Sequence, residues 1–429
     1  MPKVFDRGPL RVVLPPVTGL VRRNLAYLRC AFALVGAIFV PALMAADWPC
    51  FRGGAPLSVS SATNLPIQLS DSQAVAWKTP LEGKGVSSPI VIDGRVVVTS
   101  ASGNQEQRLH VRCFAAKTGE ALWERQFNAT GRTLCHATSS VAAPTPAAAD
   151  GRIFAFFSSN DLACLDLDGN LLWYRGLTYD FPAAYNDVGM ASSPLVIGDV
   201  VIVQIENQGD SFAAGLNVKT GETVWRHDRP REASWSSPSV FRARPLDPPS
   251  VLLQAPSGLT ALDPSSGNVR WDLKLKSNDI TSSTNEDGVI FLPADGITAI
   301  QPDAAGGAPK ILWKQARLNP GAASPVVQAG RLYVVNRAGV LSCAETAKGT
   351  VLWQLRLAGR FWSTPVLAGN HLYLFSDDGL AQVVALGEKG ELASSFSLGE
   401  EVMTSPAVAA GGIVVRSAEH LWKFAKPAE

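Results

Sequence analysis

The chain has 429 residues, of which 46% are hydrophobic and 17% charged, with 37 Gly and 29 Pro. This is the composition of a soluble globular protein with many turns, and it excludes a disordered chain. The formal net charge of +1 gives no electrostatic footprint for nucleic acid or for an anionic membrane surface, so we expect neither as a direct partner.

Residues 1–46 differ in kind from the rest of the chain. Arginines precede the apolar stretch 30–46, which ends in small residues before Asp47. This layout is that of a secretory signal peptide, and it predicts export to the periplasm or the extracellular space, with cleavage near Ala46. The stretch contains a proline and is shorter than the about 20 residues of a membrane span; a retained N-terminal membrane anchor is the alternative.

From residue 74 onward the chain repeats itself. Openers rich in Ser, Thr and Pro recur at Pro89, Pro146, Pro194, Pro238, Thr284, Pro325, Pro365 and Pro406. An aromatic residue recurs after a Gly-containing turn, at Trp77, Trp123, Trp173, Trp225, Trp271, Trp313, Trp353 and Phe396. Self-similarity at such a period is the signature of a repeat architecture.

Each repeat has the pattern of four short strands. In the first, "SSPIVI" is followed by a turn at "DG", then by "RVVVTS", "LHVRCFA", the tight turn "KTGE" and "ALWERQF". Short β-branched and aromatic runs between such turns are hairpin signals, and four-stranded repeats of about 40 to 45 residues are typical of β-propeller blades. We predict an all-β, eight-bladed β-propeller of four-stranded antiparallel blades, in which the aromatic residue packs between neighbouring blades.

The last repeat lacks its outer strand, because the chain nearly ends after "HLWKF". The segment 74–81, "AVAWKTPL", carries Trp77 in the aromatic position. We predict that this N-terminal segment joins the C-terminal blade, which closes the ring and leaves no open sheet edge. The expected organisation is an N-terminal lead with a signal peptide (1–46), an extension that packs on the propeller (47–73), the propeller (74–424) and a tail (425–429).

The segments "FAAKTGEALW" (114–123), "LNVKTGETVW" (216–225) and "LDPSSGNVRW" (262–271) resemble the tryptophan-docking motif of the pyrroloquinoline quinone (PQQ) type propeller repeat. The resemblance covers roughly residues 74–424. The segments "DWPCFRGG" and "ENQGDSFAAGL" are similar to those of exported PQQ-repeat-like proteins. The superfamily includes quinoprotein alcohol dehydrogenases, and also an outer-membrane-protein assembly scaffold with the same repeats and no quinone.

The catalytic residues that this resemblance implies for a quinoprotein dehydrogenase have no counterpart in the sequence. Such enzymes usually carry a vicinal disulfide against the cofactor, and no two cysteines here are adjacent. They also need a calcium or lanthanide site with a catalytic Asp, which no motif places. "LDLDG" (165–169) occupies a turn of the repeat and lacks the other ligands of a calcium loop. We expect no catalytic residue, no metal and no cofactor; PQQ with calcium is the alternative.

Two connections between repeats are enlarged. The next opener follows 23 residues after Trp123 and 21 after Trp173, against 10 to 13 in most repeats. Because antiparallel strands reverse direction, these connections emerge on the same face as the polar loop "ENQGD" (206–210). The candidate ligand or partner residues on this face are His136, Tyr179, Tyr185, Asn186, Asp187, Glu206, Asn207 and Asp210. Loops on a rigid scaffold often carry binding sites; the alternative is solvated loops whose polar residues cap turns.

Three residues before each opener lies a position that we expect at the mouth of the central channel. It is occupied by Val86, Ala143, Ala191, Trp235, Thr281, Ala322, Trp362 and Met403. Trp235 (in "SWSSPSVF", 234–241) and Trp362 stand out, and Arg360 is close by in sequence; these three are the candidate cofactor-binding residues. An indole can stack on a planar ligand or a sugar face, or it can plug the channel. We expect the paired Ser and Thr residues beside them to satisfy backbone groups, since no catalytic triad is recognisable.

The cysteines fall into two groups. Cys113, Cys164 and Cys343 lie nine or ten residues before the tryptophan of their repeat, so they share one position and are predicted to be small buried core residues. Cys50 and Cys135 lie outside the repeat and are candidates for a disulfide in an oxidising compartment, a pairing that the sequence alone does not decide.

These observations favour an exported, monomeric, non-catalytic propeller that binds a protein, peptide or carbohydrate partner through the face with the enlarged loops. A fold does not establish a function, and two alternatives stay open: a PQQ-dependent oxidoreductase with a degenerate site, and an envelope scaffold for outer-membrane protein assembly. Membrane association is expected only through a retained N-terminal segment or through a partner.

Overall fold

The computed structural model describes residues 47–55, 57–70, 74–185, 187–303 and 307–427. The expected signal peptide and the candidate residue Asn186 lie outside these described residues. Within the described part of the chain, no helix is long and apolar enough to cross a membrane.

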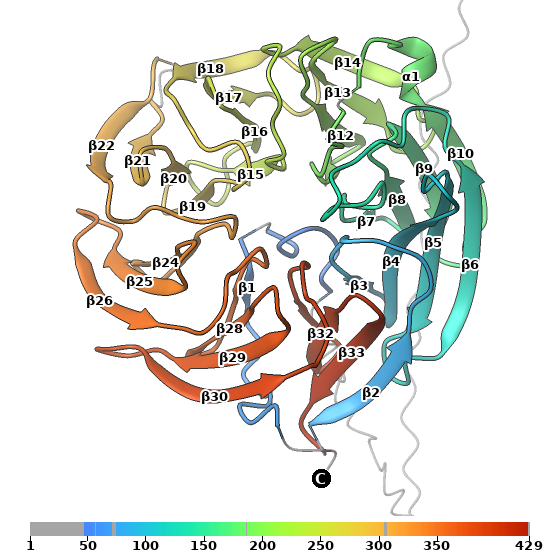
Figure 1. Cartoon of the computed structure of the whole chain (residues 1–429). Helices are drawn as coiled ribbons and strands as arrows, with labels where there is room; N and C mark the ends of the chain where they lie inside the picture. The colour runs from blue at the N-terminus through green and yellow to red at the C-terminus, as the bar shows by residue number, and fades with distance from the viewer. Residues whose placement is uncertain (1–46, 56, 71–73, 186, 304–306, 428–429) are drawn as a thin grey trace, which may run out of the picture. The chain divides into compact units, whose positions relative to one another are not determined.

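Eight sheets are arranged in a ring, which confirms the predicted eight-bladed β-propeller (Figure 1). We number the blades from 1 to 8, starting with the blade of β3. Their inner strands are β3 (Ile90–Ile92), β7 (Ala147–Ala149), β11 (Leu195–Ile197), β15 (Ser239–Phe241), β19 (Thr284–Glu286), β23 (Val326–Gln328), β27 (Val366–Ala368) and β31 (Ala407–Ala409). Their second strands are β4 (Arg95–Ser102), β8 (Arg152–Phe156), β12 (Val200–Ile205), β16 (Ser250–Ala255), β20 (Val289–Pro293), β24 (Arg331–Val335), β28 (His371–Phe375) and β32 (Gly412–Arg416).

The third and outer strands complete each blade. The third strands are β5 (Arg108–Ala115), β9 (Asp161–Asp166), β13 (Phe212–Asn217), β17 (Gly258–Leu262), β21 (Ile297–Gln301), β25 (Val340–Glu345), β29 (Leu380–Ala385) and β33 (His420–Ala425). The outer strands are β6 (Ala121–Asn128), β10 (Leu171–Gly176), β14 (Thr223–Asp228), β18 (Val269–Lys274), β22 (Lys310–Gln315), β26 (Val351–Arg356), β30 (Glu391–Ser397) and, in blade 8, β2 (Val75–Pro80). The remaining elements are β1 (Val59–Ser60) and the short helix α1 (Leu177–Asp180).

The two ends of the propeller sequence share blade 8. β2 pairs antiparallel with β33, with Val75 opposite Phe424 and Pro80 opposite His420. The predicted ring closure is therefore confirmed: an N-terminal segment supplies the outer strand that the C-terminal blade lacks.

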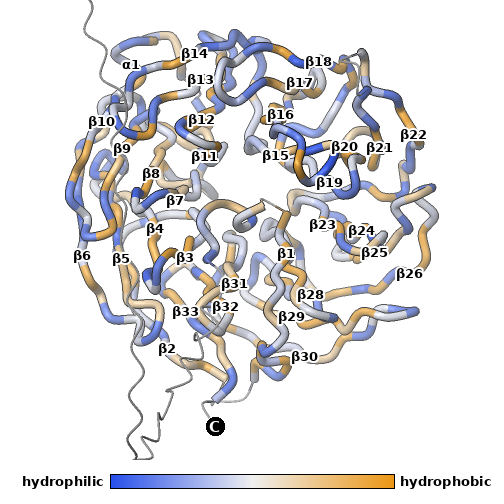
Figure 2. Tube along the Cα trace, turned by 180° about the vertical axis from the view of Figure 1, so that it is seen from behind, coloured by the Kyte–Doolittle hydropathy of each residue, from blue (hydrophilic) through white to orange (hydrophobic). Residues whose placement is uncertain are grey.

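The burial of each strand follows from its place in the blade. Second and third strands are covered on both faces by neighbouring blades, so all six residues "VVIVQI" of β12 are buried. Outer strands have only one covered face, so "ALWERQFN" of β6 alternates between partly covered and exposed residues. Figure 2 shows this alternation as changes between orange and blue along the rim.

The outer-strand tryptophans join each blade to the next. The indole N–H of Trp123 donates to Leu167 O, and that of Trp225 to Pro264 O, both in the following blade and both at 2.9 Å. The Trp123 indole also covers the tight turn of that blade, where a Cβ on Gly169 would lie 2.6 Å from the ring. Gly169 has a φ of +79°, so this turn requires glycine for its backbone as well as for the close approach. The predicted packing of aromatics between blades is confirmed.

One detail of the predicted repeat alignment is wrong in blade 7. The strand register places Ser394, and not Phe396, at the position that tryptophan holds in the other outer strands. Phe396 lies two residues further along the same face. The N-terminal extension occupies the space beside this position: Ser394 Oγ donates to Ile67 O, and Leu65 and Leu69 are buried in the adjoining hydrophobic cluster.

A second detail is wrong in blade 5. β19 begins at Thr284, whereas every other inner strand begins one residue after its opener proline. The opener of blade 5 is therefore Ser283, and the channel position three residues before it is Ile280 rather than Thr281. Thr281 is fully buried, while Ile280 lines the channel. This repeat lacks the proline that fixes the alignment elsewhere.

Residues 48–55 and 57–60 lie toward the centre of the ring (Figure 1). Trp48 pairs with Val91 in blade 1. Arg52 donates to two backbone carbonyls, just before the inner strands of blades 5 and 6, at 2.9 Å each. β1 then pairs with β27 of blade 7 as a parallel strand. This segment therefore connects blades 1, 5, 6 and 7 across the ring.

Candidate functional site

Eight hydroxyl groups form a closed ring around the channel. The residue before each opener is Ser or Thr, and its backbone N–H donates to the hydroxyl oxygen of the corresponding residue in the next blade. The ring runs through Ser88, Thr145, Ser193, Ser237, Ser282, Ser324, Thr364 and Ser405 and back to Ser88, with N···O distances of 2.9 to 3.2 Å. It couples every blade to its neighbour at the axis, whereas the tryptophans at the rim are present in every outer strand except that of blade 7.

The hydroxyl one residue earlier in the opener has a different role. Ser87 Oγ donates to Thr99 O (3.1 Å), and Ser236 Oγ donates to Gln254 O (2.9 Å), each acceptor in the second strand of its own blade. Ser87 and Ser236 therefore satisfy backbone groups, as the sequence predicted, whereas the equivalent hydroxyls of Ser192, Thr281 and Ser363 are buried without a partner among the described residues.

A cavity of about 450 Å³ lies inside the hydroxyl ring. All eight ring residues line it, together with the eight residues found three positions before each opener. Most of the wall outside the hydroxyl ring is apolar, including Phe51 of the N-terminal segment and Val188 of an enlarged loop; His136, Thr138 and Ser139 are also part of it. The cavity is therefore bounded by polar hydroxyls at the ring and by a largely apolar wall elsewhere.

The two candidate tryptophans both line this cavity, and Arg360 does not. The Trp235 indole N–H donates to Gly189 O at 2.8 Å, which fixes the ring in the wall. Trp362 is 43% exposed. Arg360 points away into solvent, with 80% of its side chain exposed, and forms an ion pair with Asp377 at 3.1 Å.

The donor set of the cavity does not fit PQQ with a metal ion. Of the described residues that line it, none is Asp, Glu, Asn, Gln, Lys or Arg. Calcium requires six to eight oxygen ligands, several of them carboxylates, and the carboxylates of the quinone need cationic or amide partners. Hydroxyls and one imidazole supply neither.

A group of three possible metal ligands, Glu400, Glu419 and His420, lies at the edge of blade 8. The Lys78 ammonium already holds Glu400 Oε1 at 2.9 Å, and Ser417 Oγ donates to Oε2 at 2.6 Å. Although partial burial raises the pKa of Glu400, these hydrogen bonds lower it to about 2. The group is therefore a satisfied ion-pair cluster beside a fixed cation, which opposes metal binding.

The two enlarged loops, residues 129–146 and 177–194, are tied to each other; we call them the loop sector. The backbone N–H of His136 donates to the backbone carbonyl oxygen of Val188 at 3.0 Å. The Arg132 guanidinium lies 3.6 Å from the Tyr185 ring centroid and 3.4 Å from Asp187 Oδ1. The structure thus brings three of the predicted face residues into one connected surface.

The loop "ENQGD" adjoins the loop sector through its backbone. The Asp210 N–H donates to Ala183 O at 3.0 Å, and the Asp210 side chain pairs with Arg226 at 2.5 Å. Tyr179, on α1, is 76% exposed. Asp210 and Tyr179 therefore also lie in or beside the loop sector, as proposed from the sequence.

Two predicted face residues, Glu206 and Asn207, are wrongly placed, because both are fully buried. Asn207 caps its own loop: its amide nitrogen donates to Asp210 O at 3.0 Å, and its Oδ1 accepts the Gly209 N–H at 2.7 Å. For Asn207 the alternative of a turn-capping residue is correct.

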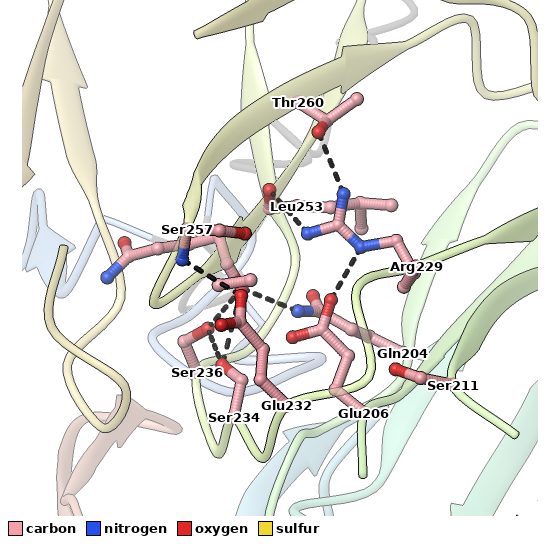
Figure 3. Close-up of polar contacts among 12 residues, drawn as sticks. Gln204, Glu206, Ser211, Arg229, Glu232, Ser234, Ser236, Leu253, Ser257 and Thr260 are labelled. Carbon is pink, nitrogen blue, oxygen red and sulfur yellow. Dashed lines mark hydrogen bonds and ion pairs between the residues drawn. The ribbon is translucent and has the colours of Figure 1, made fainter. Parts of the chain in front are cut away.

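Glu206 belongs to a buried ion pair that joins blades 3 and 4 (Figure 3). Its Oε1 accepts from Arg229 Nε at 2.5 Å. The same guanidinium donates to Thr260 Oγ1 (2.8 Å) and to Leu253 O (3.2 Å) in the next blade. Burial raises the pKa of the Glu206 carboxyl, and the charge of Arg229 opposes this. The pair is a structural connection between blades.

The suggested disulfide between Cys50 and Cys135 is not formed, and both residues are free thiols. They belong to different hydrophobic clusters, and Cys50 Sγ donates to Gly53 O at 2.9 Å. Burial raises the pKa of Cys50 to about 12. The repeat cysteines behave as predicted: Cys113, Cys164 and Cys343 are buried, each directly opposite the tryptophan of its blade.

Sequence reasoning missed three features around the axis: the closed hydroxyl ring, the channel-crossing segment with Phe51, and the buried cation Arg416. Arg416 is the last residue of β32 in blade 8 and is fully buried, with Nη1 2.8 Å from Ser87 Oγ of blade 1. The recurrent Ser or Thr directly before the opener proline was the available signal for the ring.

Comparison with known proteins gives the same architecture. Residues 49–182, 127–289 and 295–393 match the family described as outer membrane protein assembly factor BamB. The chain is 26% identical over 281 residues to the outer membrane protein assembly factor BamB of Moranella endobia (strain PCIT), which covers 63% of this chain and 66% of that protein. The chain spans about half to two thirds of the length of the curated relatives that it matches.

Two solved structures share the fold. BamB from Moraxella catarrhalis has a TM-score of 0.57 at 18% identity, with 82% of this chain and 97% of that chain covered. A europium-containing methanol dehydrogenase has a TM-score of 0.67 at 14% identity, with 87% and 90% covered. At these identities the likeness concerns the fold alone. The sequence match, which spans well over half of the residues, shows that the chain belongs to the PQQ-type propeller-repeat family described as outer membrane protein assembly factor BamB.

Proposed function

We propose that this chain is an exported, non-catalytic scaffold that binds a protein partner of the cell envelope through the loop sector. The observation that carries the proposal is the exposure of large hydrophobic side chains on two loops that are fixed to each other. Leu134 is 59% exposed, Tyr179 76% and Tyr185 36%. An exposed apolar patch on a monomer is typical of a protein interaction site, and fixed loops lose little conformational freedom on binding.

The family supports the choice of partner class, since its relatives are named outer membrane protein assembly factors. An envelope location agrees with the signal-peptide pattern before Asp47. The alternative of a PQQ-dependent oxidoreductase shares the propeller fold, but the cavity wall offers a quinone and its metal no charged or amide side chain.

The test compares substitutions of exposed hydrophobic side chains on two surfaces of one molecule. Leu134→Ser with Tyr179→Ser alters the loop sector; Leu122→Ser is the matched control, because Leu122 is 48% exposed on the outer strand β6. We expect a photo-crosslinker placed at Tyr179 in cells to capture a defined envelope protein. Affinity for that protein should fall by about tenfold or more in the loop-sector variant and stay unchanged in the control.

Equal affinity of the two variants for the captured protein would contradict the proposal. Unfolding curves of both variants serve as the folding control, because each surface substitution of this kind changes stability by less than about 0.5 kcal/mol.

A further inference from the structure

The ring hydroxyls that line the central cavity are hydrogen-bond acceptors in the fold, yet their own protons have no acceptor. Each hydroxyl oxygen receives one backbone N–H from the preceding blade. Among the described residues, no carbonyl, carboxylate or other acceptor takes the O–H of any of the eight. All eight residues are more than nine-tenths buried and border the cavity. Because a buried donor without an acceptor is costly, whatever fills the cavity must accept from this ring.

The aromatic wall adds a second, independent feature. Trp235 is held by its hydrogen bond to Gly189 O, so its ring is a fixed surface. Trp362 faces the cavity with 43% of its surface exposed, and its indole N–H makes no hydrogen bond within the described part of the chain. An exposed indole with a free N–H offers both an apolar face and a donor.

The electrostatics narrow the class of ligand. The described residues of the wall include no Lys, Arg, Asp or Glu, and His136 is the one titratable side chain among them. An anion or a cation taken into this cavity would lose its hydration, and the wall offers hydroxyl groups but no counter-charge, which is unfavourable. The ligand that fits is uncharged, rich in oxygen, and has an apolar face.

A saccharide has these properties, since its hydroxyl and ring oxygens accept hydrogen bonds and its C–H face stacks on an indole. The volume of about 450 Å³ lies within the range of small-ligand sites, about 300 to 1,000 Å³. We propose that the central cavity binds an uncharged saccharide, with the ring hydroxyls donating to sugar oxygens and Trp362 stacking on a sugar face. This rests on the proposed function in one respect, that the propeller is a binding protein and not a catalyst.

The experiment titrates the full-length chain with three neutral trisaccharides: maltotriose with α(1→4) linkages, cellotriose with β(1→4) linkages, and N,N′,N″-triacetylchitotriose with β(1→4) linkages and acetamido groups. Calorimetry gives the affinity, and tryptophan fluorescence reports on the cavity. We expect saturable binding of at least one of them at micromolar to millimolar concentration, and no binding of trigalacturonic acid, whose carboxylates find no cation in the wall. Trp362→Ala should weaken binding by about tenfold, which corresponds to the loss of one stacking contact.

Tyr179→Ser is the control, because Tyr179 is not among the residues that line the cavity. It should leave saccharide binding unchanged while it weakens partner capture, and Trp362→Ala should do the reverse, so failure of either proposal is visible separately. Binding of none of the neutral trisaccharides, equal affinity for the acidic one, or Trp362-dependent binding of an uncharged peptide instead would overturn the saccharide assignment.

Discussion

Replacing Glu206 by alanine is expected to lower the free energy of unfolding by about 3 to 5 kcal/mol. The substitution leaves the Arg229 guanidinium, whose side chain is 3% exposed, without the carboxylate that neutralises it. Total stabilities of folded domains are about 5 to 15 kcal/mol, so the loss is a large part of the whole. Urea unfolding of the wild type and the variant measures it as a shift of the midpoint.

A matched control lies at the end of the neighbouring outer strand. Asp228 pairs with Arg226, but its side chain is 81% exposed, so Asp228→Ala should cost no more than about 1 kcal/mol. Replacing both partners of the buried pair, Glu206→Leu with Arg229→Met, should recover much of the lost stability, because no buried charge remains. If Glu206→Ala and Asp228→Ala lower stability equally, the pair does not join blades 3 and 4 as described.

Replacing Arg416 by alanine is expected to cost about 2 to 5 kcal/mol, as for other large side chains removed from a core. Arg416 is the largest fully buried side chain among the described residues, and its Nη1 donates to Thr99 O and Ser87 Oγ across the seam between blades 8 and 1. That seam closes the ring, so Arg416→Ala should also increase proteolysis of the terminal strands β2 and β33.

We expect that the seam between blades 8 and 1 requires a hydrogen-bond donor at position 416 and does not require its positive charge. The strand registers place Gln204 and Gln254 at the same position in blades 3 and 4, and Gln204 Nε2 donates to Gln254 O at 2.7 Å as Arg416 does to Thr99 O. We therefore expect Arg416→Gln to be at least as stable as the wild type at neutral pH, since it keeps a donor and removes a buried charge.

The stabilities of the wild type and of Arg416→Gln are expected to depend differently on pH. Burial, and to a lesser extent the charge of Arg112, lowers the pKa of Arg416 to about 9. The unfolded chain binds this proton more tightly, so the wild type gains stability relative to Arg416→Gln as the pH rises above about 9. A loss of stability in Arg416→Gln as large as in Arg416→Ala would mean that the charge itself is needed.

Fold class, blade count and ring closure were predictable because tryptophan, glycine and proline each mark one place in the blade. Trp77 identified the outer strand of blade 8, although this strand is far in sequence from the other strands of that blade, and the structure confirms it. The alignment failed at Ser394 and Ser283, where the marking tryptophan or proline is absent. The alignment of the repeats therefore depends on a few marker residues. Where a marker is absent, the alignment is set by packing between blades, which the sequence does not show.

The site was less predictable, because burial in a propeller depends on the next blade rather than on the local sequence. Glu206 stands in a polar loop that looks solvent-exposed, yet Arg229, 23 residues later, and strands of blade 4 enclose it. The location of Trp235 and Trp362 at the channel could be predicted, because each lies three residues before its opener. The direction of the ring hydroxyls could not be predicted, since it depends on pairing between blades.

The central claim, that this propeller is a binding scaffold and not a quinoprotein, is tested most directly by calorimetric titration of the full-length chain with PQQ, with and without calcium. The account predicts no saturable binding and no quinone absorbance band in the protein fraction. Calcium-dependent binding near one equivalent, lost in Trp235→Ala or Trp362→Ala, would contradict it and place a cofactor in the cavity.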